Sequence, residues 1–198
     1  LCREKLPTIP TGVEFDFVNS TALLNAINAK GGKLTAQSGN TYKVLWLDSS
    51  AKYMTLKVLK KIKVLADAGI EIVGSKPIGT PSLADSADEF KKIADNVWSL
   101  PNVKSRIQQL GFTPDIVVRN TTNKILFRHR KNGEQHIYWL TNRSENPTDA
   151  EISFRISGKI PELWNPISGK TERISYKIVD NRTIIPVKFD SWDSYFIL

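Results

Sequence analysis

The clearest pattern of hydrophobic and polar positions runs from residue 42 to residue 83. Residues 44–47 form a short apolar run of strand length, and residues 70–73 form a second one that is rich in β-branched side chains. Between them, apolar positions recur at helical spacing, lysines occupy the opposite face, and Gly69 stands where a helix would end. The apolar positions are Leu56, Leu59, Ile62, Leu65 and Ala66.

This strand–helix–strand order predicts a parallel sheet with a right-handed crossover. The second strand leads into a loop rich in Gly, Pro and Ser at residues 74–82. Ligands of such sheets bind beyond the carboxyl ends of the strands, where this loop is expected to lie. Asp48 and Asp85 come closest to that edge in the sequence, although Asp85 and Asp88 also fit a simpler interpretation as partners of a helix dipole.

The rest of the first half extends this α/β pattern. We expect strands at residues 15–18, 34–36 and 41–47 and a short helix at 21–29. Ser86 followed by Glu89 is a capping box that predicts a helix at 86–98, and a third helix is expected at 103–110, ending at Gly111. Pro114 marks a boundary, which gives an α/β domain at residues 1–114 and a second domain at 115–198.

In the second domain, hydrophobic and polar residues alternate with a period of two. Two turn sequences, Asn132-Gly133 and Asp180-Asn181, each separate a pair of strand patterns. Short strands at regular spacing indicate an antiparallel β-sandwich. The expected strands are residues 124–130, 135–142, 151–157, 161–164, 172–179, 183–189 and 195–198.

The first of these hairpins brings the two histidines together. If Asn132 and Gly133 form a two-residue turn, then His129 faces His136 directly across the strands. A metal would need a third ligand, and the nearest acid is Glu134 at the tip. We therefore favour a packed pair at the edge of the sandwich and expect no metal there and no cofactor elsewhere, with His129 and His136 as the weak metal candidates.

Composition and charge narrow the functional classes. The chain has 198 residues, of which 40% are hydrophobic, and no apolar run is long enough to span a membrane. The single cysteine, Cys2, excludes an internal disulfide. The net charge of +8 would suit a nucleic acid, but the lysines follow the solvated faces of predicted helices and no nucleic-acid-binding motif is present. We expect no nucleic-acid partner.

Several short sequence segments, taken in order, resemble the accessory region of glycoside hydrolase family 106, whose members are α-L-rhamnosidases. Asn165 departs from the family's Leu-Trp-Asp-Pro pattern. The segments of the first half are GVEFDFVN (12–19), ALL (22–24), YKVLWL (42–47), YMTL (53–56), GSKP (74–77) and PSL (81–83). Those of the second half are FRHR (127–130), IYWLTN (137–142), ELWNPISG (162–169) and SYFIL (194–198).

The resemblance implies a bacterial glycoside hydrolase whose catalytic carboxylates belong to a barrel domain upstream of this region. These residues would then be a non-catalytic, C-terminal accessory region that supports that domain in the same polypeptide, in the periplasm or outside the cell. The expected fold is α/β plus all-β, namely a partial flavodoxin-like or amidotransferase-like parallel layer of Rossmann-like type, incomplete at its N-terminus, followed by a small β-sandwich.

The alternative function is a free-standing module that binds carbohydrate or a protein partner. Aromatic faces stack on sugar rings, and Trp192 has polar neighbours on both sides, which makes it the best exposed aromatic candidate. With Asp48 and Asp85 it forms the candidate carbohydrate-binding set, for a plant or bacterial polysaccharide. We also expect an uncovered edge near the N-terminus, which would either support a homodimer or be covered by residues 1–11.

Overall fold

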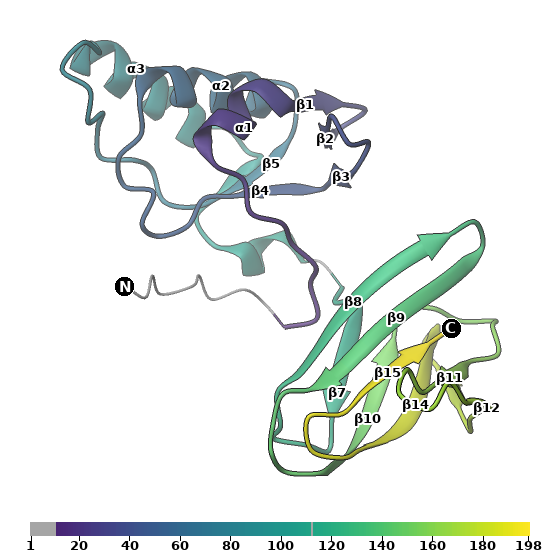
Figure 1. The fold of residues 1–198 in the computed structure, drawn as a ribbon. Helices are drawn as coiled ribbons and strands as arrows, with labels where there is room; N and C mark the ends of the chain where they lie inside the picture. The colour runs from purple at the N-terminus through teal and green to yellow at the C-terminus, as the bar shows by residue number, and fades with distance from the viewer. Residues whose placement is uncertain (1–10, 112) are drawn as a thin grey trace. The chain divides into compact units, whose positions relative to one another are not determined.

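The computed structural model describes residues 11–111 and 113–198. Their contacts divide into two units, residues 16–111 and residues 11–15 together with 113–198, and each unit is described by itself. Helices occur in the first unit, whereas the second is built from β-strands (Figure 1). An α/β part followed by an all-β part is therefore confirmed. The expectations for Cys2 and for a covering role of residues 1–11 fall mainly on residues 1–10, which lie outside the described part.

The first unit opens with a small antiparallel sheet of strand order β1-β2-β3. The side chain of Asn19 accepts a hydrogen bond from the backbone of Ala22 and caps the first helix. That helix is shorter than predicted because Ile27 becomes extended and pairs with Ala36. The elements are α1 (Ser20–Ala26), β1 (Ile27–Lys30), β2 (Lys33–Ala36) and β3 (Thr41–Tyr42).

The predicted strand–helix–strand unit is confirmed and is followed by a second one. Three parallel strands lie in the order β4-β5-β6, joined by two helices. Figure 1 shows the helices of this unit along one side of β4 and β5. The elements are β4 (Val44–Trp46), α2 (Leu56–Asp67), β5 (Glu71–Val73), α3 (Ala87–Trp98) and β6 (Val103–Lys104).

The core of this unit lies between the helices and the sheet. All five apolar positions predicted for α2 are buried, and Ile70, Ile72, Phe90 and Val97 join them. Ser86 caps α3 by accepting a hydrogen bond from the backbone of Glu89, as predicted. Gly74 ends β5 with φ +144°, and a side chain there would meet Leu47, so this position requires glycine.

Three predicted elements of the first half are wrong. The single strand predicted at 41–47 is divided into β3 and β4, which belong to different sheets. Residues 15–18 form no strand, because their alternating pattern has no ladder to join, and Phe17 is exposed. Residues 103–110 form no α-helix. Val103 and Lys104 pair with β5 as strand β6, and only Ile107–Leu110 form a turn of 3₁₀-helix, so pairing in the sheet overrides the local helical pattern.

The second unit is a β-sandwich of two antiparallel sheets, as predicted. One sheet has the strand order β13-β14-β10-β7 and the other β12-β11-β15-β9-β8. In Figure 1 the long β8–β9 hairpin and β15 lie in front of β7 and β10. The strands are β7 (Ile116–Arg119), β8 (Ile125–Asn132), β9 (Gln135–Asn142), β10 (Thr148–Phe154), β11 (Glu162–Trp164), β12 (Thr171–Arg173), β13 (Lys177–Val179), β14 (Arg182–Phe189) and β15 (Ser194–Ile197).

The turn at Asp180-Asn181 is confirmed, and both residues have positive φ, at 49° and 57°, as a type I′ hairpin requires. The single strand predicted at 172–179 is wrong. It is divided into β12 and β13, which belong to different sheets. Strand β7 was not predicted. It pairs with β10 at the edge of its sheet and contributes the buried Ile116.

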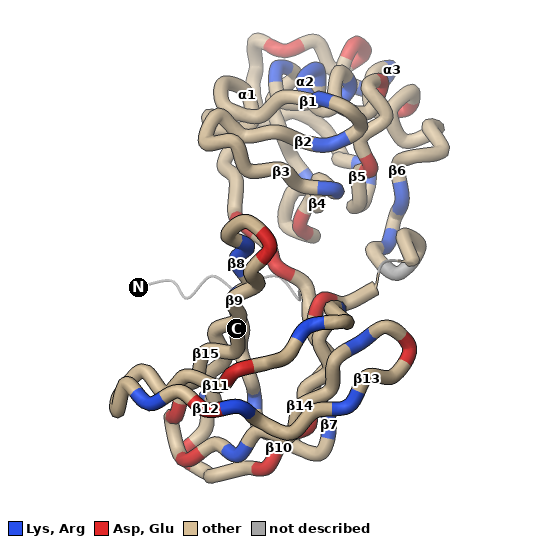
Figure 2. The backbone as a smooth tube through the Cα atoms, turned by 90° about the vertical axis from the view of Figure 1, so that its right-hand side faces the viewer, with Lys and Arg blue, Asp and Glu red and all other residues tan. Residues whose placement is uncertain are grey.

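Basic and acidic residues are interspersed along the backbone of both units (Figure 2). Many of them pair locally, as Lys63 does with Asp67 and Lys177 with Glu151. Within residues 11–111 and 113–198, no helix is long and apolar enough to cross a membrane.

Candidate functional site in the sandwich

Asp48 follows β4 at the carboxyl end of the parallel sheet, where the sequence places it. Its carboxylate accepts a hydrogen bond of 2.9 Å from the backbone of Ser50. The hydrogen bonds from Ser50 also lower the pKa of Asp48 below its usual value. Asp48 therefore stabilises the turn that follows the strand.

Asp85 has a similar structural role at the start of α2. Its Oδ2 atom accepts hydrogen bonds from the backbone N–H of Leu56, at 2.7 Å, and from the hydroxyl of Thr80, at 2.6 Å. The bond from Leu56, followed by that from Thr80, lowers the pKa of Asp85. The carboxylate thus satisfies a free N–H at the helix N-terminus and ties the loop after β5 to α2.

Trp192 lies in the loop between β14 and β15 and is exposed, at 61% of its surface. The guanidinium carbon of Arg143 lies 6.0 Å from the ring centroid, over one face of the indole. Its backbone has φ +56°, a conformation that bulky residues rarely adopt. The predicted exposure is therefore present, while the predicted sugar binding remains a prediction.

The two histidines come together, but in a register that differs from the predicted one. His129 faces Tyr138, and His136 faces Lys131. The turn consists of Gly133 and Glu134, with positive φ at Gly133, which is the pattern of a type II′ hairpin with glycine first. The predicted turn at Asn132-Gly133 is wrong by one residue. The partner shifts by two positions, so both histidines stay on the same face of the sheet.

A chain of hydrogen bonds joins these histidines to Asp115. The Nδ1 atom of His129 lies 2.7 Å from Oδ2 of Asp115, and its Nε2 atom lies 2.9 Å from Nδ1 of His136. The ring of His129 also stacks on Tyr138, with ring centroids 4.0 Å apart. The order Asp115–His129–His136 is therefore fixed by two short hydrogen bonds and one aromatic contact.

Asp115 is held by further donors on its other side. Its Oδ1 atom accepts a hydrogen bond from the hydroxyl of Tyr138, and the guanidinium of Arg155 lies 3.4 Å away. Arg182 donates to the backbone oxygen of Asp115. The side chain and backbone of Asp115 are thus held together by donors from β8, β9 and β14 and from the residue that follows β10.

The electrostatics of this cluster favour a charged Asp115 and a neutral His136. Burial opposes ionisation of Asp115, but the hydrogen bond and charge of His129, together with Arg155 and Tyr138, outweigh it, and the pKa of Asp115 lies below its usual value. Burial lowers the pKa of His136, and the positive charges of His129, Lys131 and Lys159 lower it further. Burial and the nearby Asp115 raise the pKa of Tyr138.

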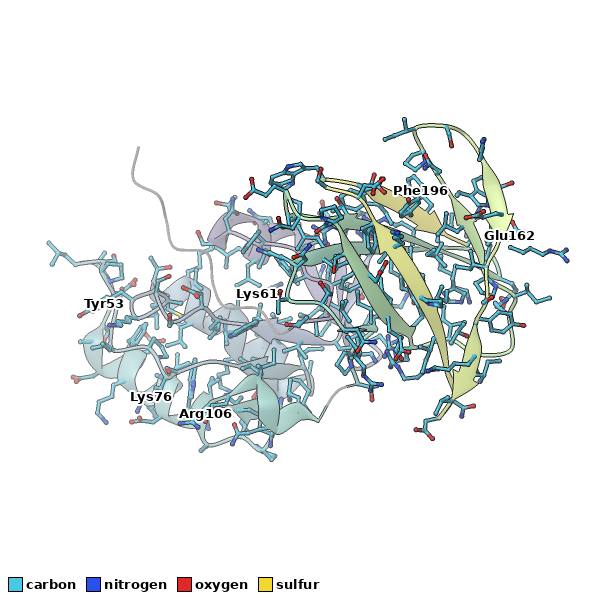
Figure 3. The ribbon with its side chains drawn as sticks, turned by 90° about the horizontal axis from the view of Figure 1, so that it is seen from below. Tyr53, Lys61, Lys76, Arg106, Glu162 and Phe196 are labelled. Atoms are coloured by element: carbon cyan, nitrogen blue, oxygen red, sulfur yellow. The ribbon has the colours of Figure 1, made fainter. Side chains whose placement is uncertain are left out.

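His136 lies in the wall of a pocket at one end of the sandwich. The pocket has a volume of about 390 Å³ and is lined from both sheets and from the connection between β10 and β11. Ligand sites in proteins range from about 300 to about 1,000 Å³. Glu162, at the start of β11, is one of the lining residues and is labelled in Figure 3.

The sequence indicated the histidine pair but missed Asp115 and the pocket. In the sequence, Asp115 stands out only as the first residue of the second domain, and its partners come from segments far apart in the chain. The period-two pattern offers one signal, since it places His129 and Tyr138 on positions that can face the same side. Among the described residues, no three His, Cys, Asp or Glu side chains gather as a metal site.

Comparisons with known proteins identify the family. The family model for glycoside hydrolase family 106, described as alpha-L-rhamnosidase, matches residues 1–178. A solved structure, a rhamnosidase from Novosphingobium sp. PP1Y, is similar with a TM-score of 0.87 and 31% identity, covering 98% of this chain and 20% of that one. A curated relative from Formosa agariphila, named "Putative beta-glucuronidase", is 28% identical over 94% of this chain and 17% of its own length.

The 198 residues thus span about a fifth of the length of these relatives. The resemblance seen in the sequence is confirmed over most of the chain, because the family match covers both the α/β unit and most of the sandwich. The chain belongs to glycoside hydrolase family 106, the alpha-L-rhamnosidase family.

Proposed function

We propose that these residues are a non-catalytic accessory region of a bacterial glycoside hydrolase that resembles α-L-rhamnosidases. In this role they support the fold or the assembly of a catalytic domain in the same polypeptide. The observation that carries the proposal is the use of the candidate carboxylates. Asp48 holds a turn, Asp85 caps a helix, and Asp115 is bound by His129, Tyr138 and Arg155.

Glycoside hydrolysis normally needs two carboxyl groups across the scissile bond, one of them a general acid with a raised pKa. The carboxyl pKa values that depart from the ordinary range in the described residues are those of Asp48, Asp85, Asp95 and Asp115, and all four are lowered. These groups are suited to accept hydrogen bonds and ion pairs, and they are poorly suited to donate a proton to a leaving group.

A patch of apolar side chains on the α/β unit supports an assembly role. The backbone of Ile78 donates to the carbonyl of Lys52, and Tyr53 forms a bridge with Gly79, so the two segments lie side by side. Tyr53 is 59% exposed and Ile78 is 68% exposed. Large exposed apolar patches mark contact surfaces. We propose that Tyr53 and Ile78 belong to one, and that its occupant is the catalytic domain of the same polypeptide.

The first test is an activity assay. We expect the purified chain to release no product from an aryl α-L-rhamnoside, because its candidate carboxylates are engaged elsewhere. The control is the same preparation of an Asp115→Asn variant, since contaminating activity would survive in both. Turnover that co-purifies with the chain and is reduced by substitution of its own carboxylates would contradict the proposal.

The second test asks whether the chain stabilises the upstream domain. The coding sequence upstream of Leu1 would be expressed separately and mixed with the 198-residue chain. We expect the chain to raise the melting temperature of the upstream domain, and Ile78→Ser to reduce this effect. Val64→Ser is the matched control, because Val64 is 61% exposed on α2 in the same unit. Equal stabilisation by both variants would exclude the patch, and no stabilisation by the unmodified chain would exclude the supporting role.

Carbohydrate binding at Trp192 is the second candidate function. Its exposed ring and its strained backbone support it, because strain of this kind is often retained at binding sites. A plant or bacterial polysaccharide would be the partner, consistent with a periplasmic or extracellular location. We expect Trp192→Ala to weaken retention in an affinity gel that contains the polysaccharide, and Trp164→Ala, which removes another partly exposed tryptophan, to leave it unchanged.

A further inference from the structure

We propose that the pocket at the end of the sandwich binds one neutral, polyhydroxylated small molecule, the chemical class of a single monosaccharide unit. His136 is the residue that recognises it. This inference goes beyond the accessory role, and it concerns a different place from Trp192. It rests on the shape of the pocket, on the way its charged groups are already engaged, and on the hydrogen-bond chain that ends at His136.

The inner wall of the pocket is apolar. Phe154, Ile185 and Ile197 line it and are buried core residues of strands from both sheets. Ile156 and the exposed Ile160 add apolar surface from the connection between β10 and β11. An apolar wall suits the C–H face of a sugar ring, and the volume of about 390 Å³ is at the small end of the range for ligand sites.

The charged groups of the pocket are already engaged in contacts with the protein. The ammonium group of Lys159 donates to the backbone oxygen of Glu134 at 2.7 Å, which ties the β10–β11 connection to the hairpin tip. The carboxylate of Glu162 accepts from the indole N–H of Trp164. The carboxylate of Glu134 pairs with Lys131 at 3.6 Å. The lining therefore has two acids, Glu134 and Glu162, and one lysine, Lys159, and this excess of acid disfavours an anion. These contacts favour a neutral ligand over an anion or a cation.

The hydrogen-bond chain determines what His136 can offer to a ligand. A charged Asp115 accepts a hydrogen bond from the N–H at Nδ1 of His129. If His129 is neutral, its Nε2 atom accepts, so Nδ1 of His136 must donate and Nε2 of His136 is left as a free acceptor. If His129 is protonated, both of these roles reverse and Nε2 of His136 becomes a donor.

In either state, Nε2 of His136 has one defined role toward a hydroxyl of the ligand, as acceptor or as donor. A hydroxyl can match either role, because it can both donate and accept. His129 and Asp115 act as positioning residues, because they fix the tautomer and the orientation of the imidazole. The charged and titratable groups around His136 are His129, Lys131, Lys159 and Asp115. Burial and the positive members of this set favour its neutral form, which suits an uncharged ligand.

The experiment is a titration of the ¹⁵N-labelled chain with methyl α-L-rhamnoside and methyl α-D-glucoside, with D-glucuronate as the charged arm. We expect saturable shifts with a millimolar dissociation constant for the neutral sugars, at Ile156, Lys159 and Ile185, and weaker shifts for the anion. His136→Ala should weaken binding by about tenfold or more, whereas Trp192→Ala should leave it unchanged. His129→Gln should weaken binding less and should alter the tautomer of His136.

Three results would overturn the inference: no saturable shift at the pocket with any sugar, shifts centred on Trp192 that Trp192→Ala abolishes, or equal binding by His136→Ala. Mapping the shifts on the unmodified chain decides the matter even if His136→Ala fails to fold, and His136→Gln offers a variant of closer volume. If no sugar binds in the pocket, the result expected from the aryl rhamnoside assay stays the same. Failure of this inference is therefore distinct from failure of the accessory role.

Discussion

The two units use polar side chains in different ways. In the α/β unit, Asn19, Thr55, Asp85 and Ser86 each accept a backbone N–H at the start of a helix, and the core between helices and sheet is apolar. In the sandwich, Asp115 and its partners form a half-buried network that crosses strands and ends at a pocket. Polar residues that end elements stabilise a fold, whereas a polar chain that leads to a cavity can also serve a ligand.

The largest effect is expected from the apolar core of the α/β unit. Ile72→Ala removes a fully buried side chain from β5 and should lower the free energy of unfolding by about 2–5 kcal/mol. Urea denaturation followed by circular dichroism measures this loss. Val64→Ala on the exposed face of α2 should change stability by less than about 0.5 kcal/mol. A small effect of Ile72→Ala would mean that the core of this unit is loosely packed.

The sandwich should respond less strongly to the loss of the half-buried carboxylate of Asp115. Asp115→Ala leaves His129 and Tyr138 without an acceptor and should cost about 1.5–3 kcal/mol, the range for hydrogen bonds to charged groups. Asp149→Ala, an exposed acid on β10, is the matched control and should have little effect. Equal effects of the two substitutions in urea denaturation would show that the network adds nothing to stability.

This contrast explains what the sequence could reveal. Helices α2 and α3 were predicted correctly because periodicity and a cap are local signals. Residues 15–18 and 103–110 were misinterpreted because strand pairing decides them, and the sequence does not show which partner is available. The predicted hairpin register is wrong by one turn residue, because both Asn132-Gly133 and Gly133-Glu134 can form a tight turn.

The candidate site shows the same limit. His129 and His136 are seven residues apart and could be paired from the hairpin alone, even with the wrong register. Asp115, Arg155 and Arg182 reach the network from other strands, so only the tertiary fold brings them together. Trp192 was correctly expected to be exposed, because its neighbours in the sequence are polar.

A smaller effect is expected where a single cap is removed. Ser86 accepts the backbone N–H of Glu89 at the start of α3. Ser86→Ala should lower stability by about 0.5–2 kcal/mol, and Ser86→Gly by only a few tenths. Thermal unfolding of the two variants side by side checks this difference. Equal losses would show that the hydroxyl of Ser86 is not the capping group.

The smallest effect is expected in the dependence of stability on pH. The folded chain holds the pKa of His136 below the ordinary value of 6.5, so the unfolded state binds a proton first as the pH falls. The free energy of unfolding should therefore decline as the pH drops below about 6.5 toward the lower folded pKa. Asp115, whose pKa is also lowered, should add a further decline below its ordinary value of 3.8.

His136→Asn should flatten the upper part of this profile and leave the part below pH 3.8 unchanged. Urea denaturation at a series of pH values measures both regions. A profile that is identical in the unmodified chain and in His136→Asn would contradict the assignment of the upper region to His136.

The most direct test of the contrast between the units is the tautomer of the two histidines. Long-range ¹H–¹⁵N correlation spectra of the labelled chain at neutral pH distinguish a protonated ring nitrogen from an unprotonated one. With both rings neutral, the hydrogen-bond chain from Asp115 predicts protons on Nδ1 of His129 and on Nδ1 of His136, with Nε2 of His136 unprotonated. Asp115→Asn should disturb this pattern. Two histidines in the Nε2–H form, unchanged by Asp115→Asn, would contradict the account.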